Sequence, residues 1–135
     1  MVGPPQYALL GYVRSTIFDN FIGLAERCYH IYKLYVFELV RSRDFDTWLR
    51  DLSDHQAKAR VLARLNSAEL GNLGDWGAVG SSVSEMRVHC GAGYRMYFVR
   101  NNMTINLLID GIKGSQRRDI ERAKELAKAL KERGQ

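Results

Sequence analysis

Arginine, histidine and tyrosine side chains recur at alternate positions on both sides of a short glycine-rich segment. Arg87 and His89 precede Gly91-Ala92-Gly93, and Arg95 and Tyr97 follow it. Guanidinium groups bind phosphate oxygens, whereas imidazole and phenol groups transfer protons. Because alternate residues of a strand share one face, these side chains meet on one face if the two segments pair as a hairpin.

The residues between them are apolar, which predicts the opposite face of the same hairpin. With 91–93 as a three-residue loop, Cys90 pairs with Tyr94, His89 with Arg95, and Arg87 with Tyr97. A slip of one residue would bury arginines among apolar groups, so this register is favoured. The predicted core face is Met86, Val88, Cys90, Tyr94, Met96 and Phe98, and the predicted polar face is Glu85, Arg87, His89, Arg95 and Tyr97.

A third strand is predicted to follow a turn at Asn101-Asn102, because asparagine tolerates the positive φ of a type I′ turn. The resulting register sets Ile105 opposite Phe98 on the core face and Leu108 opposite Arg95 on the polar face. Ile105 and Leu107 thereby join the core face. The three strands form an antiparallel meander with one apolar side and one basic side.

Periodicity and turn residues predict the elements that hold this meander. Residues 32–40 are rich in aromatic and β-branched residues, which is typical of a strand. Apolar residues between Phe45 and Leu52 have helical spacing, and Ser53 with Gln56 forms a capping box for a second helix. Glycines at 71, 74 and 77 predict a loop, and a final helix begins at about Ser115. The order strand, helix, helix, three strands, helix predicts an α+β domain, a small antiparallel sheet with the helices on one face.

The first 31 residues differ from the rest of the chain. Pro4-Pro5 favours an extended or turn-like start, and Phe18, Phe21, Ile22 and Ala25 have helical spacing. We expect residues 1–31 to form an extension, either disordered or a helix packed loosely outside the sheet. The domain itself is expected to span 32–135.

Length and composition limit the possible functions. The 135 residues are 46% hydrophobic, as expected for one compact domain. The net charge of +5 is compatible with a polyanionic partner but is also common in ordinary soluble proteins. No apolar run is long enough for a membrane helix, and the start lacks the basic region of a secretory signal. Cys28 and Cys90 do not resemble a disulfide framework and are expected to be reduced, and the three histidines lack the spacing of a metal site. We expect a cytoplasmic protein with no metal, no cofactor and no membrane partner.

Each polar feature also has a simpler interpretation. Charged residues on the open side of an antiparallel sheet are usually only solvated, and His89 beside a turn is more often a surface histidine than a catalyst. The basic residues of the final helix are typical of a solvated face as well as of nucleic-acid contact. The concentration of Arg87, His89, Arg95 and Tyr97 on one predicted face is what favours a functional site.

Several segments together resemble a known family. They are Phe45-Asp-Thr-Trp-Leu, Gly71-Asn-Leu-Gly-Asp, Val79-Gly, Glu85-Met-Arg, Gly91-Ala-Gly-Tyr-Arg-Met-Tyr-Phe, Lys113-Gly-Ser-Gln and Asp119-Ile. In this order and spacing the chain, from about Tyr32 to Leu130, resembles the phage-derived, HigB-like branch of the RelE/ParE toxin superfamily. Proteins of this kind are called addiction module killer proteins.

The resemblance implies the toxin of a type II toxin–antitoxin system, neutralised by an antitoxin that usually has a helix-turn-helix domain. RelE-like members cleave mRNA on the ribosome without a metal or cofactor, as the ribose 2′-hydroxyl attacks the adjacent phosphate. ParE-like members instead inhibit DNA gyrase. A third alternative is an inactive prophage remnant that only binds its antitoxin.

The resemblance also implies roles for particular residues. Arg95 matches the family arginine that contacts the scissile phosphate, and Arg87 and Lys113 lie near positions that are basic in relatives. His89 and Tyr97 are placed to transfer protons by their location alone. Some RelE relatives have a catalytic tyrosine in the final helix, which this chain lacks, so proton transfer must depend on other groups.

Overall fold

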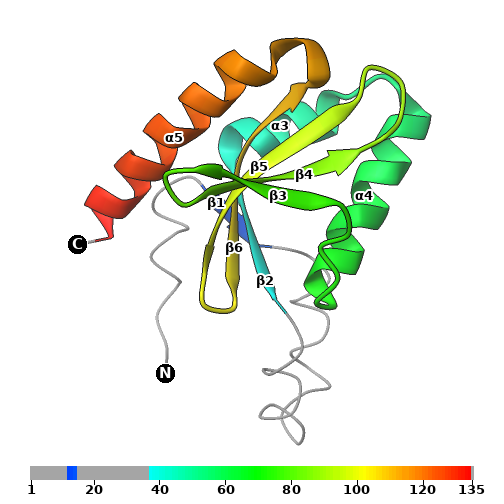
Figure 1. Ribbon diagram of the computed structural model, residues 1–135. Helices are drawn as coiled ribbons and strands as arrows, with labels where there is room; N and C mark the ends of the chain where they lie inside the picture. The colour runs from blue at the N-terminus through cyan, green and yellow to red at the C-terminus, as the bar shows by residue number, and fades with distance from the viewer. Residues whose placement is uncertain (1–11, 15–36, 135) are drawn as a thin grey trace, which may run out of the picture.

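A single mixed sheet with helices on both faces forms the body of the protein (Figure 1). The computed structural model describes residues 12–14, by their backbone alone, and residues 37–134. The elements in chain order are β1 (Tyr12–Arg14), β2 (Glu38–Ser42), α3 (Arg43–Asp51), α4 (His55–Glu69), β3 (Trp76–Gly80), β4 (Val83–Val88), β5 (Tyr94–Asn101), β6 (Thr104–Ile112) and α5 (Gln116–Arg133). A short 3-10 turn, Lys113–Ser115, leads into α5. The strand order in the described sheet is β1-β2-β6-β5-β4-β3.

Short polar side chains cap the starts of α3 and α4. The Ser42 hydroxyl accepts a hydrogen bond from the Phe45 amide and starts α3, while also donating to the Leu108 carbonyl at 2.6 Å. The Asp54 carboxylate accepts from the Ala57 amide and starts α4. The start of the second helix was therefore predicted one residue early, because the carboxylate of Asp54 and not the hydroxyl of Ser53 caps the free amide.

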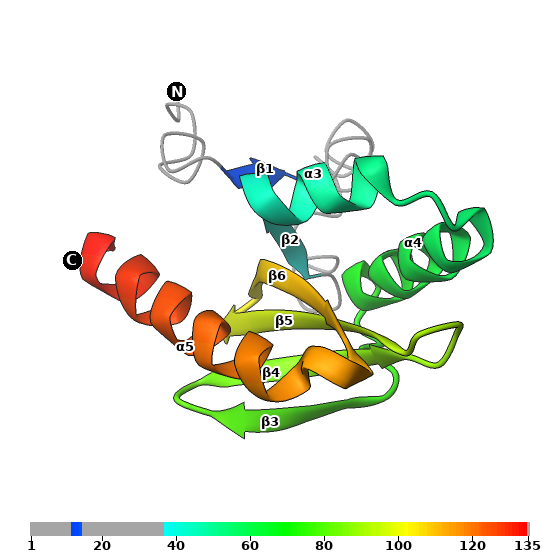
Figure 2. The same cartoon turned by 90° about the horizontal axis from the view of Figure 1, so that it is seen from above.

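Two apolar clusters lie on opposite faces of the sheet. The predicted core residues are buried together under α3 and α4: Met86, Val88, Met96, Phe98, Ile105 and Leu107. The other cluster packs against α5 and contains Val83, Tyr97, Leu108, Ile109 and Ala123. Figures 1 and 2 show α4 and α5 on opposite sides of the strands, so the expectation of helices on one face is wrong. The final helix is amphipathic and needs an apolar face to cover, and the α3–α4 side is already occupied.

The sheet is mixed, which corrects the predicted antiparallel arrangement. Strand β2 runs parallel to β6, with Leu39 opposite Ile105. The chain passes through both helices and three strands between β2 and β6, and such a long connection allows parallel pairing. The meander also has one more strand than predicted, since Trp76–Gly80 forms β3 beside β4. The two glycines of β3 and the glycine-rich loop before it interrupt the alternating apolar pattern of a strand. The sequence therefore predicts a loop at these residues.

The register of the central hairpin differs from the prediction by two residues. Val88 lies opposite Tyr94 and Arg87 lies opposite Arg95, so the connection spans 89–93. A shift of two is one full period of a strand, and every side chain therefore keeps its predicted face. In the β5–β6 pair, Phe98 lies opposite Leu107, and a bulge between Tyr97 and Phe98 displaces the pairing further.

The amino-terminal segment contributes to the sheet. Tyr12–Arg14 pairs antiparallel with β2, so the expectation that 1–31 stays outside the sheet is wrong for these residues. The predicted helix around Phe18–Ala25, Cys28, and residues 32–36 of the predicted first strand lie outside the described residues. Cys90 is a free thiol. None of the described helices is both long and apolar enough to cross a membrane.

Candidate functional site

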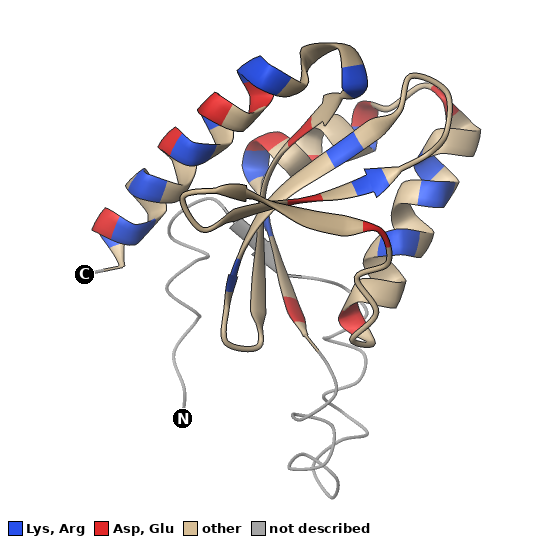
Figure 3. Cartoon of the chain, viewed as in Figure 1, with Lys and Arg blue, Asp and Glu red and all other residues tan. Residues whose placement is uncertain are grey.

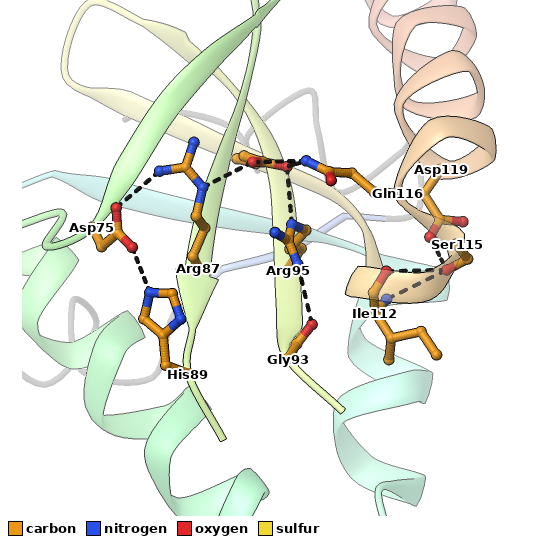
Figure 4. Close-up of polar contacts among 10 residues, drawn as sticks. Asp75, Arg87, His89, Gly93, Arg95, Ile112, Ser115, Gln116 and Asp119 are labelled. Carbon is orange, nitrogen blue, oxygen red and sulfur yellow. Dashed lines mark hydrogen bonds and ion pairs between the residues drawn. The ribbon is translucent and has the colours of Figure 1, made fainter. Parts of the chain in front are cut away.

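Arg87, His89 and Arg95 gather where β4 and β6 end and β5 begins, near the start of α5 (Figure 4). Arg87 and Arg95 lie directly opposite each other on β4 and β5. His89 is the first residue after β4, and Lys113 the first after β6. The Lys113 amide donates to the Gly93 carbonyl at 2.9 Å, which places Lys113 beside the hairpin connection. The structure thus brings Arg87, His89, Arg95 and Lys113 to one end of the sheet.

Glu85 occupies the centre of this cluster as a buried carboxylate. Its Oε1 accepts a hydrogen bond from Arg87 Nε at 2.9 Å, and its Oε2 lies 3.4 Å from Arg95 Nε. The Gln116 side-chain amide donates to both oxygens at 3.1 Å. The Glu85 side chain is only 2% exposed, so its charge is balanced by the two arginines and not by water.

Asp75, just before β3, links Arg87 to His89. Arg87 Nη1 donates to Asp75 Oδ1 at 2.9 Å, and His89 Nε2 lies 2.6 Å from Asp75 Oδ2. The hydrogen bond with His89, and next that with Arg87, hold the pKa of Asp75 below its ordinary value. An ionised Asp75 accepts a hydrogen bond from Nε2–H of His89, which leaves Nδ1 on the other side of the ring. The His89 side chain is 75% exposed and therefore open to a ligand.

Arg87 is the most highly connected of the predicted residues. Its hydrogen bonds to Glu85 and then to Asp75 raise its pKa, so it stays cationic at any ordinary pH. Gly77 of β3 lies under its guanidinium, because a Cβ built there would approach Arg87 Nη2 to 2.8 Å. Only a glycine leaves the guanidinium its present place.

Arg64 of α4 holds the backbone that carries Asp75 and Arg87. Its guanidinium donates to the carbonyls of Arg87 at 2.8 Å, Leu73 at 2.7 Å and Asp75 at 3.1 Å. The Arg87 amide in turn donates to the Asp75 carbonyl at 2.9 Å. The loop before β3 is therefore fixed to β4, and the His89–Asp75–Arg87 contacts rest on a rigid backbone.

The first turn of α5 is attached to the same end of the sheet. The Ser115 hydroxyl donates to the Asp119 carboxylate and lies 3.4 Å from the Ile112 amide. Gln116 reaches back to Glu85, as described above. The helix start thereby closes one side of the arginine pair.

Tyr97 departs from its predicted role. It lies on the predicted face, but α5 covers that part of the face and the side chain is fully buried. Burial, and next the negative charge of Glu85, raise the pKa of its hydroxyl. Tyr97 cannot reach a substrate, so its expected role in proton transfer is corrected: it is a core residue.

The predicted basic side carries acidic groups as well. Asp75 and Glu85 balance Arg87 and Arg95, whereas the Lys113 ammonium has no hydrogen-bond or ion-pair partner in the described part of the chain. Figure 3 shows acidic and basic residues interleaved along α5. Arg122 of α5 pairs with Asp44 of α3 at 3.5 Å, which fits the simpler interpretation of this helix as a solvated face.

The sequence prediction missed two members of the cluster and underestimated a third. Asp75 and Gln116 each end a segment that carries the family resemblance, but the sequence predicts neither as a site residue, and it predicts a loop at Asp75 because β3 is not recognised. Glu85 was placed on the correct face without a role. A carboxylate two residues before an arginine on the same strand face was the available signal.

The cluster combines groups suited to work on a phosphate. The arginines supply donors for its oxygens, and an exposed imidazole oriented by a carboxylate supplies a base. No group of His, Cys, Asp and Glu residues able to hold a metal ion occurs within residues 37–134.

Comparison with known proteins gives one informative match. The chain is 40% identical over 87 residues to an uncharacterized protein from Haemophilus influenzae, and the match covers 64% of this chain and 88% of that protein. No protein-family model matches the chain. No solved structure matches it significantly.

Proposed function

The chain belongs to the same family as the uncharacterized Haemophilus influenzae protein, and we propose that it is a toxin of the RelE/ParE superfamily, HigB-like, that cleaves mRNA on the ribosome. In this proposal it is the toxin of a type II toxin–antitoxin pair. Its partners are a helix-turn-helix antitoxin and ribosome-bound mRNA in the cytoplasm.

One observation carries the proposal: an exposed, carboxylate-oriented histidine lies beside a pair of arginines. His89 Nε2 is held by Asp75, and the same carboxylate contacts Arg87. Nδ1 of His89 therefore faces away from Asp75 as a base for a ribose 2′-hydroxyl. The 2′-oxygen then forms a bond to the phosphorus while the bond from phosphorus to the 5′-oxygen of the next nucleotide breaks. The products are a 2′,3′-cyclic phosphate and a 5′-hydroxyl, whose oxygen takes a proton from water. Negative charge builds up on the phosphate oxygens in the transition state.

The arginines and Lys113 stabilise that added charge. Arg95 has its Nη1 only weakly engaged, at 3.5 Å from the Gly93 carbonyl, and so its outer edge is available to a phosphate. Lys113 beside Gly93 supplies a supporting cation. Hydrogen-bond donors that tighten on a developing charge typically contribute about 3 kcal/mol, roughly a hundredfold in rate.

The decisive experiment measures mRNA cleavage on translating ribosomes by the wild type and by Arg95→Ala and His89→Ala variants. Mapping of transcript ends after brief induction in cells gives the parallel measurement in vivo. We expect cleavage by the wild type and a strong loss in both variants with the fold retained. A supercoiling assay with DNA gyrase is run on the same preparations.

The other outcomes identify the alternatives. Inhibition of gyrase without mRNA cleavage would assign the protein to the ParE-like class. Binding of an antitoxin with neither activity would indicate an inactive remnant. Equal cleavage by the wild type and Arg95→Ala would remove Arg95 from the mechanism.

A further inference from the structure

The buried carboxylate at the centre of the cluster points to a role beyond charge balance. We infer that Glu85 is a positioning residue, which aligns Arg87 and Arg95 so that their guanidiniums bind one phosphodiester together. This inference rests on the proposed nuclease function. Glu85 itself is 2% exposed on its side chain and cannot touch the substrate.

The contacts define how the alignment works. Glu85 Oε1 accepts a hydrogen bond from Arg87 Nε, whereas Oε2 forms an ion pair with Arg95 Nε at 3.4 Å without a hydrogen bond. The carboxylate therefore lies at the inner edge of both guanidiniums, and neither Nη2 has a hydrogen-bond partner among the described residues. Arg87 Nη1 is already taken by Asp75, so Glu85 and Asp75 together fix the plane of that guanidinium.

Electrostatics explains why a carboxylate is needed at this position. Arg87 and Arg95 lie directly opposite across the strands, where like charges repel. Glu85 attracts both and keeps them on the same side of the sheet. In a Glu85→Gln variant, the side-chain NH₂ would face an N–H donor of one arginine. Two donors cannot form a hydrogen bond with each other, so that guanidinium must turn away.

Gln116 makes the carboxylate itself rigid. Its amide donates to both oxygens at 3.1 Å from the first turn of α5. Glu85 is therefore held from β4, β5 and α5 at once. Residues that fix the orientation of groups binding a substrate contribute to rate without contacting the substrate.

The test compares Glu85→Gln with Glu125→Gln, a matched change on the exposed side of α5. We expect both to remain folded by circular dichroism, but Glu85→Gln to lower the maximal cleavage rate on ribosomes at least tenfold. Combined with Arg95→Ala, Glu85→Gln should add little further loss, because it acts through the arginines. The inference would be overturned if the losses of cleavage rate caused by Glu85→Gln and Arg95→Ala were fully additive. It would also be overturned if Glu85→Gln left the maximal cleavage rate unchanged.

A spectroscopic measurement separates this inference from the proposed function. The Nε–Hε signal of Arg87, assigned with an Arg87→Lys variant, should be protected from exchange in the wild type and lose protection in Glu85→Gln, because this N–H donates to Glu85. If the wild type cleaves no RNA, the nuclease proposal fails, and this signal alone decides the role of Glu85. Unchanged protection would overturn it.

A second variant covers the case in which Glu85→Gln does not fold. Glu85→Asp keeps the charge but withdraws the carboxylate by one methylene, so it cannot reach both arginines. We expect a folded protein whose maximal cleavage rate falls several-fold and in which the Nε–Hε signal of Arg87 loses protection. Wild-type values for both would overturn the inference.

Discussion

Arg87 and Arg95 lie directly opposite each other on β4 and β5, and both contact the same buried carboxylate. The predicted register had set Arg87 opposite Tyr97 and Arg95 opposite His89. The longer hairpin connection brings the two arginines together and places His89 at the open end, beside Asp75. The site is therefore a connected set of ion pairs, in which a change at one residue alters the orientation of its neighbours.

Arg95→Ala should abolish growth inhibition while the protein stays folded. The side chain is 12% exposed and lies outside the apolar core, so its loss removes the proposed phosphate contact without opening the core. We expect a cleavage rate lower by roughly a hundredfold. Arg95→Lys should recover only part, since an ammonium cannot reproduce the guanidinium geometry. Lys113→Ala should have a smaller effect than Arg95→Ala, and a larger one would reverse their assigned roles.

Asp75→Asn should lower cleavage at least tenfold and also change the response of stability to acid. The folded pKa of Asp75 lies below its ordinary value of 3.8, so its ion pairs stabilise the protein fully above that pH. This stabilisation disappears as the pH falls through the lowered folded pKa. Urea unfolding of both proteins at pH 7 and at acid pH measures the effect. Their difference in unfolding free energy should shrink in acid, and a difference independent of pH would contradict the ion-pair assignment.

Gly77→Ala tests the placement of the Arg87 guanidinium without touching its charge. The added methyl would lie 2.8 Å from Arg87 Nη2, the movable end of a long side chain. We expect a several-fold loss of cleavage with little change in melting temperature. Gly114→Ala is the control, because a methyl there meets no atom within 4 Å. Similar activity of the two variants would show that the position of Arg87 does not matter.

Tyr97→Phe should leave cleavage unchanged. The hydroxyl is buried beneath α5 and has no hydrogen-bond partner among the described residues, so it does not reach a substrate and its removal leaves no described group unsatisfied. Removing it should alter stability by no more than about 1 kcal/mol in either direction. Cleavage rates and thermal melts of the two proteins provide the check. If Tyr97→Phe were fully folded and still lost most of its cleavage activity, Tyr97 would again be a candidate for proton transfer.

Asp110→Asn should stabilise the protein at neutral pH. Burial, as the main cause, raises the pKa of this carboxyl, so its ionisation opposes folding. The protonated form favours the folded state, and that benefit is lost as the pH rises through the raised folded pKa. We expect a melting temperature higher by a few degrees at pH 7. An increase of about 1 kcal/mol in the free energy of unfolding produces a shift of this size in a domain of this length. The gain should diminish toward acid pH, and an equal gain at all pH values would exclude ionisation as the cause.

The sequence by itself determined which side chains share a face of the hairpin. Strand periodicity separates Met86, Met96 and Phe98 from Arg87 and Arg95, and this separation survives a register shift of two residues. It also determined most element types, because apolar spacing and turn residues are local properties. These local signals were sufficient to place Arg87, His89 and Arg95 on one face, whereas Lys113 was indicated only by the family resemblance.

Only the tertiary structure decided which of these groups are accessible and what they contact. The polar face is open at Arg87 and His89 but covered by α5 at Tyr97, and the sequence does not state where a helix packs. The parallel pairing of β2 with β6 and the strand β3, which brings Asp75 to His89, depend on contacts between distant segments. Glu85 gains its role in the same way, since its partners come from three separate elements. Burial and long-range pairing arise from the whole chain, and no local spacing encodes them.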